Sequence, residues 1–198
     1  MEGNADMSNR LCFTMYERVF ERFGEQGIRG SMLRENGEEK LTRLMGSLIQ
    51  PDATLPLRIL EIGTCQCVSA IILSRFGDVH TFDVREKPLT HELYQAFHET
   101  GNVYRKVIPD PKELRSEIRA LLDTARFDVA FIDGRHTAKA IEKDFELTRG
   151  IGRLIFHDYW PHDERRARRF ADVIAFVDGL QECRLTKLEP FVLWEPAT

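Results

Sequence analysis

The sequence predicts an α/β fold in which an open, mostly parallel sheet carries helices on both faces. From residue 57 onward, short apolar segments alternate with amphipathic segments of helical length. Alternation of this kind implies parallel strands joined by right-handed helical crossovers. Two of the short segments, "FDVAFID" and "RLIFHD", are apolar almost throughout, as expected of central strands that are covered on both sides.

Length and composition set the number of domains and the class of protein. The 198 residues are enough for one α/β domain with a sizeable core, whereas two full domains would be cramped. We predict a single domain over 1–198, with a helical segment over 1–52 before an α/β core over 57–195. The hydrophobic fraction of 42% and the charged fraction of 30% are ordinary for a soluble globular protein.

Charge and hydropathy argue against membranes and nucleic acid as partners. No apolar run approaches the roughly 20 residues of a membrane-spanning helix, and "MEGNADMSNR" lacks the basic start and apolar block of a secretory signal. A net charge of −4 provides no general attraction to nucleic acid or anionic membranes. We therefore expect a cytoplasmic protein.

Two amphipathic helices are expected before the sheet. Residues 7–23 and 38–49 each repeat apolar residues at helical spacing. The glycine-rich segment "GEQGIRGS" separates them, and the prolines of "QPDATLP" end the second. The apolar stripes are Leu11, Met15, Val19 and Phe23 in the first helix and Leu41, Leu44, Met45 and Leu48 in the second.

The α/β core is expected to alternate from residue 57 to residue 180. The expected strands are 57–62, 79–84, 102–108, 127–133 and 153–158, and the expected helices are 67–77, 89–101, 112–125, 137–150 and 163–180. No helix separates "ECRLTKLEP" from "FVLWE". A tight turn at Glu189-Pro190 is therefore expected to join these last two strands as an antiparallel edge.

A basic cluster, "RRARR" at 165–169, lies in the last expected helix. The apolar residues that follow it recur at i, i+3, i+4 and i+7, which places the arginines mostly on the opposite side of the helix. The cluster is either a solvated face or a contact for an anion or a partner, and the sequence leaves both open. The apolar positions are Phe170, Val173, Ile174 and Val177.

The cysteines do not predict a disulfide framework or a thiolate metal site. Cys12 and Cys183 lie far from the pair Cys65 and Cys67, and the chain has no second pair at metal-binding spacing. We interpret Cys65 and Cys67 as small, semi-apolar residues of a loop.

The strand ends are where a ligand is expected. In an open parallel sheet the binding crevice lies beyond the carboxyl ends of the strands. Gly63 directly follows the first strand, where glycine permits a sharp turn and the next helix presents free N–H groups. Asp83 ends the second strand twenty residues later, where an acid can bind ribose hydroxyls. An ordinary turn followed by a capping aspartate remains the alternative.

The motifs along these strand ends resemble a known family. "LRILEIGT" with a following "FDV", then "FDVAFIDGRH" and "LIFHDYW", resemble the class I S-adenosylmethionine-dependent methyltransferases, most closely the small-molecule O-methyltransferases of methyltransferase family 24. The similarity spans residues 57–159, and the pairing of "IDG-x-H" with "HDY" is its most specific element. It implies a Rossmann-like, doubly wound, seven-stranded sheet, mostly parallel with an antiparallel last strand.

The resemblance implies a set of cofactor contacts. Glu61 and Gly63, with Cys65 beside them, would shape the methionine end of an S-adenosylmethionine site. Further contacts implied are Ser69 to the carboxylate, Asp83 to the ribose hydroxyls and Asp110 near the adenine amine. The sequence departs from the family at Cys67, which replaces a usual glycine. Since this cofactor has no pyrophosphate, we expect binding to survive the change.

The resemblance also implies a metal and a base. Asp133, His157 and Asp158 match the ligands of a divalent ion in metal-dependent members, and His136 matches a general base. A histidine near neutral pKa accepts a proton from a hydroxyl whose pKa a metal lowers. Because magnesium prefers oxygen ligands, His157 suits manganese, iron or zinc at least as well. Helix capping by Asp133 and Asp158 is the alternative.

Other features near these ends have more than one interpretation. Tyr159 and Trp160 would form an aromatic wall over a substrate or pack as core and rim residues. Tyr16 and residues 27–31 would form a lid over the cofactor. Little chain remains for a closed pocket, so a homodimer or a large, openly bound substrate would complete it.

The leading functional hypothesis is an O-methyltransferase acting on a small hydroxylated molecule, with or without a divalent metal. A catalytically inactive methyltransferase-like binding or partner subunit is the alternative. A nicotinamide-dependent oxidoreductase is weaker, since the G-x-G-x-x-G that admits a pyrophosphate is missing.

Overall fold

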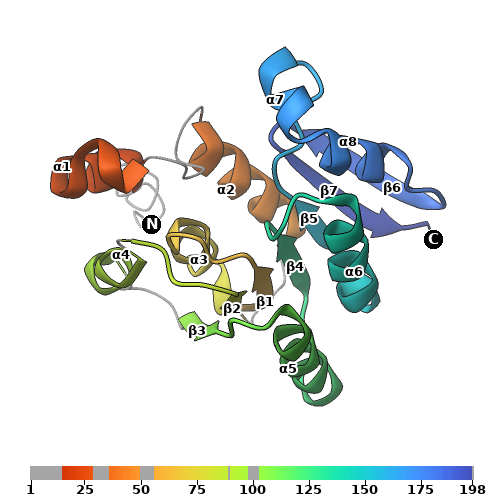
Figure 1. Cartoon of the computed structure of the whole chain (residues 1–198), viewed down its shortest axis with the longest axis horizontal. Coiled ribbons are helices and arrows are strands. Elements are labelled where there is room, and N and C mark those ends of the chain that lie inside the picture. The colour runs from red at the N-terminus through yellow and green to blue at the C-terminus, as the bar shows by residue number, and fades with distance from the viewer. Residues whose placement is uncertain (1–14, 29–35, 50–55, 89, 98–102, 198) are drawn as a thin grey trace, which may run out of the picture.

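The computed structural model describes residues 15–28, 36–49, 56–88, 90–97 and 103–197, and its strands form a single seven-stranded sheet (Figure 1). The strands are β1 (Leu57–Ile62), β2 (Gly77–Asp83), β3 (Val103–Val107), β4 (Val129–Ile132), β5 (Leu154–Phe156), β6 (Cys183–Leu188) and β7 (Phe191–Pro196). Their order across the sheet is β3-β2-β1-β4-β5-β7-β6. Strands β1 to β5 pair in parallel, and β7 is antiparallel to both of its neighbours. The predicted mostly parallel sheet with an antiparallel last strand is confirmed.

The helices cover both faces of this sheet. They are α1 (Met15–Ile28), α2 (Gly37–Leu48), α3 (Val68–Leu73), α4 (Thr90–Phe97), α5 (Pro111–Thr124), α6 (Ala138–Thr148), α7 (Glu164–Arg169) and α8 (Ala171–Asp178). A short 3-10 turn, Arg149–Ile151, follows α6. Among these described helices, none is both long and apolar enough to cross a membrane.

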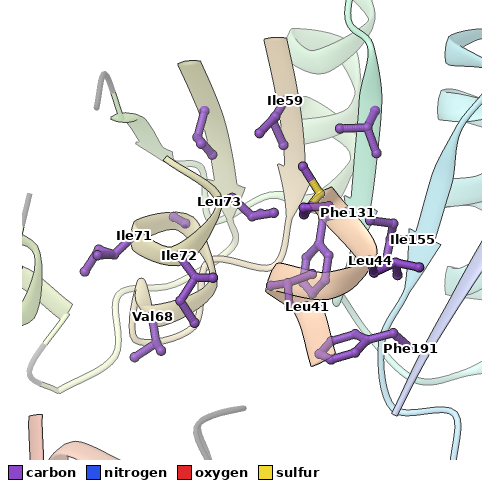
Figure 2. Packing of buried hydrophobic residues seen from close by; sticks show 14 of the residues in the cluster. Leu41, Leu44, Ile59, Val68, Ile71, Ile72, Leu73, Phe131, Ile155 and Phe191 are labelled. Atoms are coloured by element: carbon purple, nitrogen blue, oxygen red, sulfur yellow. The ribbon is translucent and has the colours of Figure 1, made fainter. Parts of the chain in front are cut away.

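The core consists of two apolar clusters, one on each face. Helices α1 to α4 pack on one face, where Leu41 and Leu44 of α2 lie against Phe131, Ile155 and Phe191 of the sheet (Figure 2). Helices α5, α6 and α8 pack on the other face. Successive strand residues alternate between the clusters, as Ile59 and Leu60 do, because side chains along a strand point to opposite faces. Strands buried on both sides therefore read as continuous apolar runs.

The N-terminal helices agree with the periodicity within the described ranges. Residues 7–14 of the first predicted helix lie outside them, and α1 runs on to Ile28. Gly24 has non-helical angles within α1 (φ 60°, ψ −155°), so the expected glycine break appears as a kink. Helix α2 begins one residue before its predicted start, at Gly37, and ends at Leu48.

The predicted helix over 163–180 is wrong as a single element. It is divided into α7 and α8 at Phe170, whose φ and ψ are −111° and 26°. The side chain of Phe170 is buried, whereas α7 has no buried residue. Because no apolar stripe holds α7 along the axis of α8, it turns away from that axis (Figure 1).

Candidate functional site

Gly63 brings the end of β1 against the end of β4. Its φ is +101°, and a Cβ on this residue would lie 2.1 Å from the carbonyl oxygen of Asp133 and 2.9 Å from the backbone nitrogen of Gly134. Any side chain here would collide with backbone atoms, which cannot move aside as a flexible side chain can. The glycine predicted to shape a cofactor loop is thus also required for the approach of the two strand ends.

Cys67 has a backbone conformation in the left-handed region that favours glycine. Its φ and ψ are 69° and 8°, in the left-handed region, and it is the residue before α3. The side chain is fully buried in the apolar cluster beneath the loop, and burial raises the pKa of its thiol. The loop therefore retains a glycine-like path while the cysteine fills core space, at the strain that a positive φ imposes on a residue with a Cβ.

Asp83 holds the loop between β1 and α3 through its backbone. The Oδ2 of Asp83 accepts a hydrogen bond from the backbone N–H of Cys65 at 2.8 Å, and Oδ1 accepts one from Arg85 at 3.2 Å. On the other side of the loop, the hydroxyl of buried Thr90 donates to the carbonyl of Cys65 or of Lys87, at 2.9 and 2.8 Å. Both backbone groups of Cys65 are thus hydrogen-bonded, and Asp83 lies beside the loop; a ribose contact by Asp83 stays a prediction.

Glu61 is a buried acid at the end of β1. Its side chain is fully buried, and burial raises the pKa of the carboxyl to about 7, while hydroxyl groups of Ser69 and Thr81 oppose that rise. Thr81 donates a short hydrogen bond to Oε2, and Thr64 lies 2.6 Å from Thr81. The other oxygen, Oε1, has no hydrogen-bond partner among the residues that the structure describes. The predicted contact Ser69 is buried on α3 and faces Glu61.

Asp110 occupies a different position from the other predicted cofactor residues. Its exposed carboxylate caps α5, where Oδ1 accepts hydrogen bonds from the backbone N–H groups of Lys112 and Glu113 at 2.7 and 3.4 Å. Capping of the helix explains an aspartate at this position, and no ligand is needed to explain it. An adenine contact by Asp110 stays a prediction.

Four side chains from the ends of β4 and β5 converge in one cluster, which we call the Asp-His cluster: Asp133, His136, His157 and Asp158. The Nδ1 of His157 lies 3.0 Å from Oδ1 of Asp133 and 3.7 Å from Oδ1 of Asp158. The Nε2 of His136 lies 3.4 Å from Asp133 and 3.1 Å from Oδ2 of Asp158. All four predicted residues are therefore brought together by the sheet.

The cluster fits a divalent metal by its donor atoms. One ligand atom from each of Asp133, His157 and Asp158 lies within 4.8 Å of the other two. The Nδ1 of His157 is buried and forms an ion pair with Asp133, but it has no hydrogen-bond partner within the described part of the chain. A buried nitrogen without a partner is costly unless something else binds it. Imidazole and carboxylate together suit manganese, iron or zinc.

Helix capping does not explain the two aspartates. Across the described residues, Asp133 and Asp158 accept no hydrogen bond from a backbone N–H; Asp158 contacts instead the indole N–H of Trp160 at 3.4 Å. The start of α6 is capped from α8, since Asp172 accepts from the backbone of Ala138 at 2.8 Å. The capping alternative is therefore wrong for both residues.

Opposite charges determine the ionisation of the cluster. Burial disfavours the charge on His157, but the carboxylates of Asp133 and Asp158 outweigh it and raise the pKa of the imidazole to about 9. Burial also opposes the charge on Asp133, yet the two histidines hold its pKa below the ordinary value. The pKa of Asp158 is raised by burial. The cluster thus has one aspartate with a lowered pKa, Asp133, and one histidine with a raised pKa, His157.

The two aromatic residues after Asp158 have different roles. Tyr159 is buried, and its hydroxyl lies 2.8 Å from Asp178 of α8 and 2.7 Å from Lys187 of β6. Tyr159 therefore belongs to the core, which is one of the two interpretations that the sequence left open. Trp160 is half-buried beside Asp158, where a rim residue would lie. The side chains of Tyr16 and of residues 27–31, predicted to form a lid, all lie outside the described side chains.

The sequence interpretation missed a buried ion pair behind the cluster. Arg115 of α5 contacts Oδ1 of Asp144 on α6 at 2.9 and 3.1 Å. Asp144 is buried, and its Oδ2 lies 3.0 Å from where a Cβ on Gly134 would be. The pair thus supports the loop that holds Asp133 and His136. No local pattern marks it, because the two residues are 29 positions apart.

Comparison with known proteins identifies solved structures that have a similar fold. No family model matches the sequence, and no curated protein matches it. An O-methyltransferase from Bacillus cereus, solved with S-adenosylhomocysteine, has a TM-score of 0.62 over 96% of this chain and 94% of its own, at 17% identity. The O-methyltransferase TomG from Streptomyces achromogenes, solved with S-adenosylmethionine, has a TM-score of 0.52 over 80% and 79%, at 20% identity.

A third solved structure is similar over most of its length. The TDP-rhamnose 3′-O-methyltransferase of calicheamicin biosynthesis has a TM-score of 0.51 over 86% of this chain and 85% of its own, at 14% identity. At such identities the likeness concerns the fold. This chain has the Rossmann-like fold of the S-adenosylmethionine-dependent methyltransferases and resembles the small-molecule O-methyltransferases among them.

Proposed function

We propose that this protein is an S-adenosylmethionine-dependent methyltransferase that methylates a hydroxyl group of a small molecule with the help of a divalent metal. One observation carries the proposal: the Asp-His cluster lies directly against the loop after β1. Gly63 of that loop approaches the backbone of Asp133 too closely for any side chain. A methyl donor on the loop and a hydroxyl at the cluster would therefore be neighbours, as methyl transfer requires.

The donor would occupy the β1 and β2 ends. One buried oxygen of Glu61, Oε1, has no hydrogen-bond partner within the described ranges, which suits it to accept a hydrogen bond from an ammonium group. Asp83 would bind the ribose hydroxyls, as acids at this position of such folds do. The bound cofactor would supply a methyl group on a sulfonium, which an attacking hydroxyl accepts as it loses its proton.

The metal would be held by Asp133, His157 and Asp158. When bound, a divalent ion lowers the pKa of a hydroxyl that it contacts. The three side chains are positioned for this by the sheet, because β4 and β5 are adjacent and parallel and their carboxyl ends lie side by side. His157 would have to bind in its neutral form, since a metal and a proton compete for the same nitrogen.

His136 would accept the proton of the substrate hydroxyl. Its imidazole is partly exposed, with 35% of the side chain accessible, whereas the three proposed ligands are accessible at 11–16%. It lies 3.1 Å from Asp158, and an edge-on contact with the Phe170 ring at 5.0 Å fixes its orientation. A carboxylate neighbour stabilises the imidazolium that forms when a histidine takes a proton.

Titration of the full chain with S-adenosylhomocysteine by calorimetry tests the proposal. We expect saturable binding that Asp83→Ala weakens by about tenfold or more, the cost of losing charge-assisted hydrogen bonds. Asp123→Asn, an exposed site on α5, serves as the matched control and should bind as the unaltered protein does. Absence of heat at millimolar ligand would contradict the proposal.

The alternative of an inactive binding subunit makes a different prediction. A cofactor loop that had lost its ligand would show no heat with S-adenosylhomocysteine. The alternative has less support here, because the loop retains its glycine-like path at Cys67 and its bond to Asp83.

A further inference from the structure

The start of α8 contacts the segment that carries His136 at two points. This segment, residues 133–137, links β4 to α6. The centre of the Phe170 ring lies 5.0 Å from that of the His136 imidazole, and the two rings are nearly perpendicular, at 86°. Two residues further along, Oδ2 of Asp172 accepts a hydrogen bond from the backbone N–H of Ala138, the first residue of α6, at 2.8 Å. The segment is thus held both at its imidazole and at its end.

Helix α6 receives its N-terminal cap from α8. The first N–H groups of a helix have no partner within it, and the side chain of the residue before the helix usually accepts a hydrogen bond from one of them. That residue is Thr137, and its side chain makes no capping hydrogen bond within the described part of the chain. Asp172 supplies the acceptor from 34 positions beyond Ala138. The place of the segment therefore depends on α8 as well as on its own residues.

Phe170 is itself fixed at the break between α7 and α8. Its side chain is buried in the apolar cluster on that face of the sheet. Its backbone N–H donates to the carbonyl of Arg166 at 2.8 Å, and its own carbonyl accepts from the N–H of Ile174 at 3.1 Å. The residue ends one helix and begins the next, so its ring is a rigid support for the imidazole that it contacts.

We propose that Phe170 and Asp172 are positioning residues for the general base His136. The ring orients the imidazole, whose Nε2 lies 3.1 Å from Oδ2 of Asp158, and the cap keeps the segment that carries the imidazole in place. The inference rests on the proposed function and deepens it, because it names the residues that make the base effective. Since a misplacement of about 1 Å can lower a rate about 100-fold, loss of either contact should slow turnover without weakening cofactor binding.

Two variants of Asp172, which is exposed, test the cap. Asp172→Asn keeps a side-chain oxygen that can accept from Ala138, whereas Asp172→Ala removes it. Turnover is measured in the full chain with S-adenosylmethionine, Mn²⁺ and catechol as the probe acceptor. We expect Asp172→Ala to lower kcat by roughly 10–100-fold and Asp172→Asn to retain most of it, since Asn and Asp cap helices about equally well. Affinity for S-adenosylhomocysteine should stay within about twofold in both variants.

The imidazole of His136 provides a second readout, by nuclear magnetic resonance, that does not depend on turnover. Its proton resonances are assigned by their loss in His136→Gln, and a nearby aromatic ring shifts them. We expect Phe170→Leu to move these resonances. Phe176→Leu is the matched control, because it removes a ring of α8 that packs on Phe145 and Phe156. It should leave the resonances of His136 in place.

Three results would overturn the inference. They are unchanged His136 resonances in Phe170→Leu, unchanged kcat in Asp172→Ala, and an equal loss of kcat in Asp172→Asn and Asp172→Ala. Failure of the unaltered protein to bind S-adenosylhomocysteine or to methylate catechol would instead overturn the proposed function, and the inference with it.

Discussion

The buried Nδ1 atom of His157 lies 3.0 Å from Oδ1 of Asp133, and the two side chains form an ion pair when His157 is protonated. Among the described residues Nδ1 has no hydrogen-bond partner, and a buried polar group without one costs about 1–3 kcal/mol. The backbone cannot relieve it, because both side chains are fixed at the ends of paired central strands. A metal ion bound by both side chains would satisfy both atoms at once.

We therefore expect the protein to bind Mn²⁺. Electron paramagnetic resonance of free Mn²⁺ should show saturable binding, weakened by about tenfold or more in Asp133→Asn, which preserves the volume but removes the charge of a ligand. Asp123→Asn, an exposed residue of α5 outside the cluster, should bind as the unaltered protein does. Equal binding by Asp133→Asn would show that the cluster is a self-contained ion-pair network.

Substitution of His136 should separate chemistry from cofactor binding. His136→Gln is expected to lower turnover by roughly 10²–10⁴-fold, the usual contribution of a general base. Affinity for S-adenosylhomocysteine should stay within about twofold, since His136 lies beyond the proposed cofactor residues. His162→Gln is a suitable control because His162 is 86% exposed and pairs only with Glu189 among the described residues. Undiminished turnover in His136→Gln would remove it as the base.

Cys67→Gly tests whether the unusual loop residue costs affinity. The thiol is buried in the core and points away from solvent, so affinity for S-adenosylhomocysteine should change by less than about twofold. The free energy of unfolding should fall by about 1 kcal/mol, because the lost buried side chain outweighs the relief of a positive φ. Calorimetry and urea unfolding measure the two effects. Tenfold tighter binding in the variant would show that Cys67 obstructs the cofactor.

Glu61 should make stability depend on pH. Its pKa is raised by burial to about 7 from 4.5, so the folded protein retains a proton that the unfolded chain has released between these values. Stability from this group is therefore greatest below pH 4.5 and falls as the pH rises to about 7, by on the order of 3 kcal/mol. In Glu61→Gln that part of the pH dependence should disappear. The measurement is urea unfolding of both proteins at several pH values. If the free energy of unfolding depended on pH in the same way in Glu61→Gln as in the unaltered protein, the assignment to Glu61 would be contradicted.

Arg115→Met should destabilise the protein through Asp144. The substitution leaves a buried carboxylate without its cation, which costs about 2–4 kcal/mol once the partial exposure of Arg115 is taken into account. Adding Asp144→Asn should recover part of the loss, since the uncompensated charge is then gone. Arg119→Met, exposed one turn further along α5, is the control for loss of an arginine. Equal stability of Arg115→Met and Arg119→Met in urea unfolding would contradict the role of the ion pair.

Features that depend on neighbouring residues could be predicted from the sequence, whereas features that depend on contacts between distant elements could not. Periodicity located every strand to within two or three residues, because a strand that is buried on one or both faces has a recognisable pattern of apolar residues within a short stretch of sequence. The helix over 163–180 was predicted as one element because its residues fit a helical period. The break at Phe170 arises because α7 has no buried residue to hold it in line with α8. The sequence also left open whether Tyr159 lines a substrate site or belongs to the core, since its partners Asp178 and Lys187 come from other elements.

The sequence by itself determined the alternation of strands and helices, the antiparallel last pair, and the set of acids and histidines at the strand ends. These follow from local hydropathy and from the rule that parallel strands end at one edge. Only the tertiary structure decided that Asp133, His136, His157 and Asp158 meet within 3.0–3.7 Å, that Asp172 caps α6 in place of Asp133, and that Cys67 faces the core. Such contacts depend on strand order and side-chain direction, and neither is encoded within a short window of sequence.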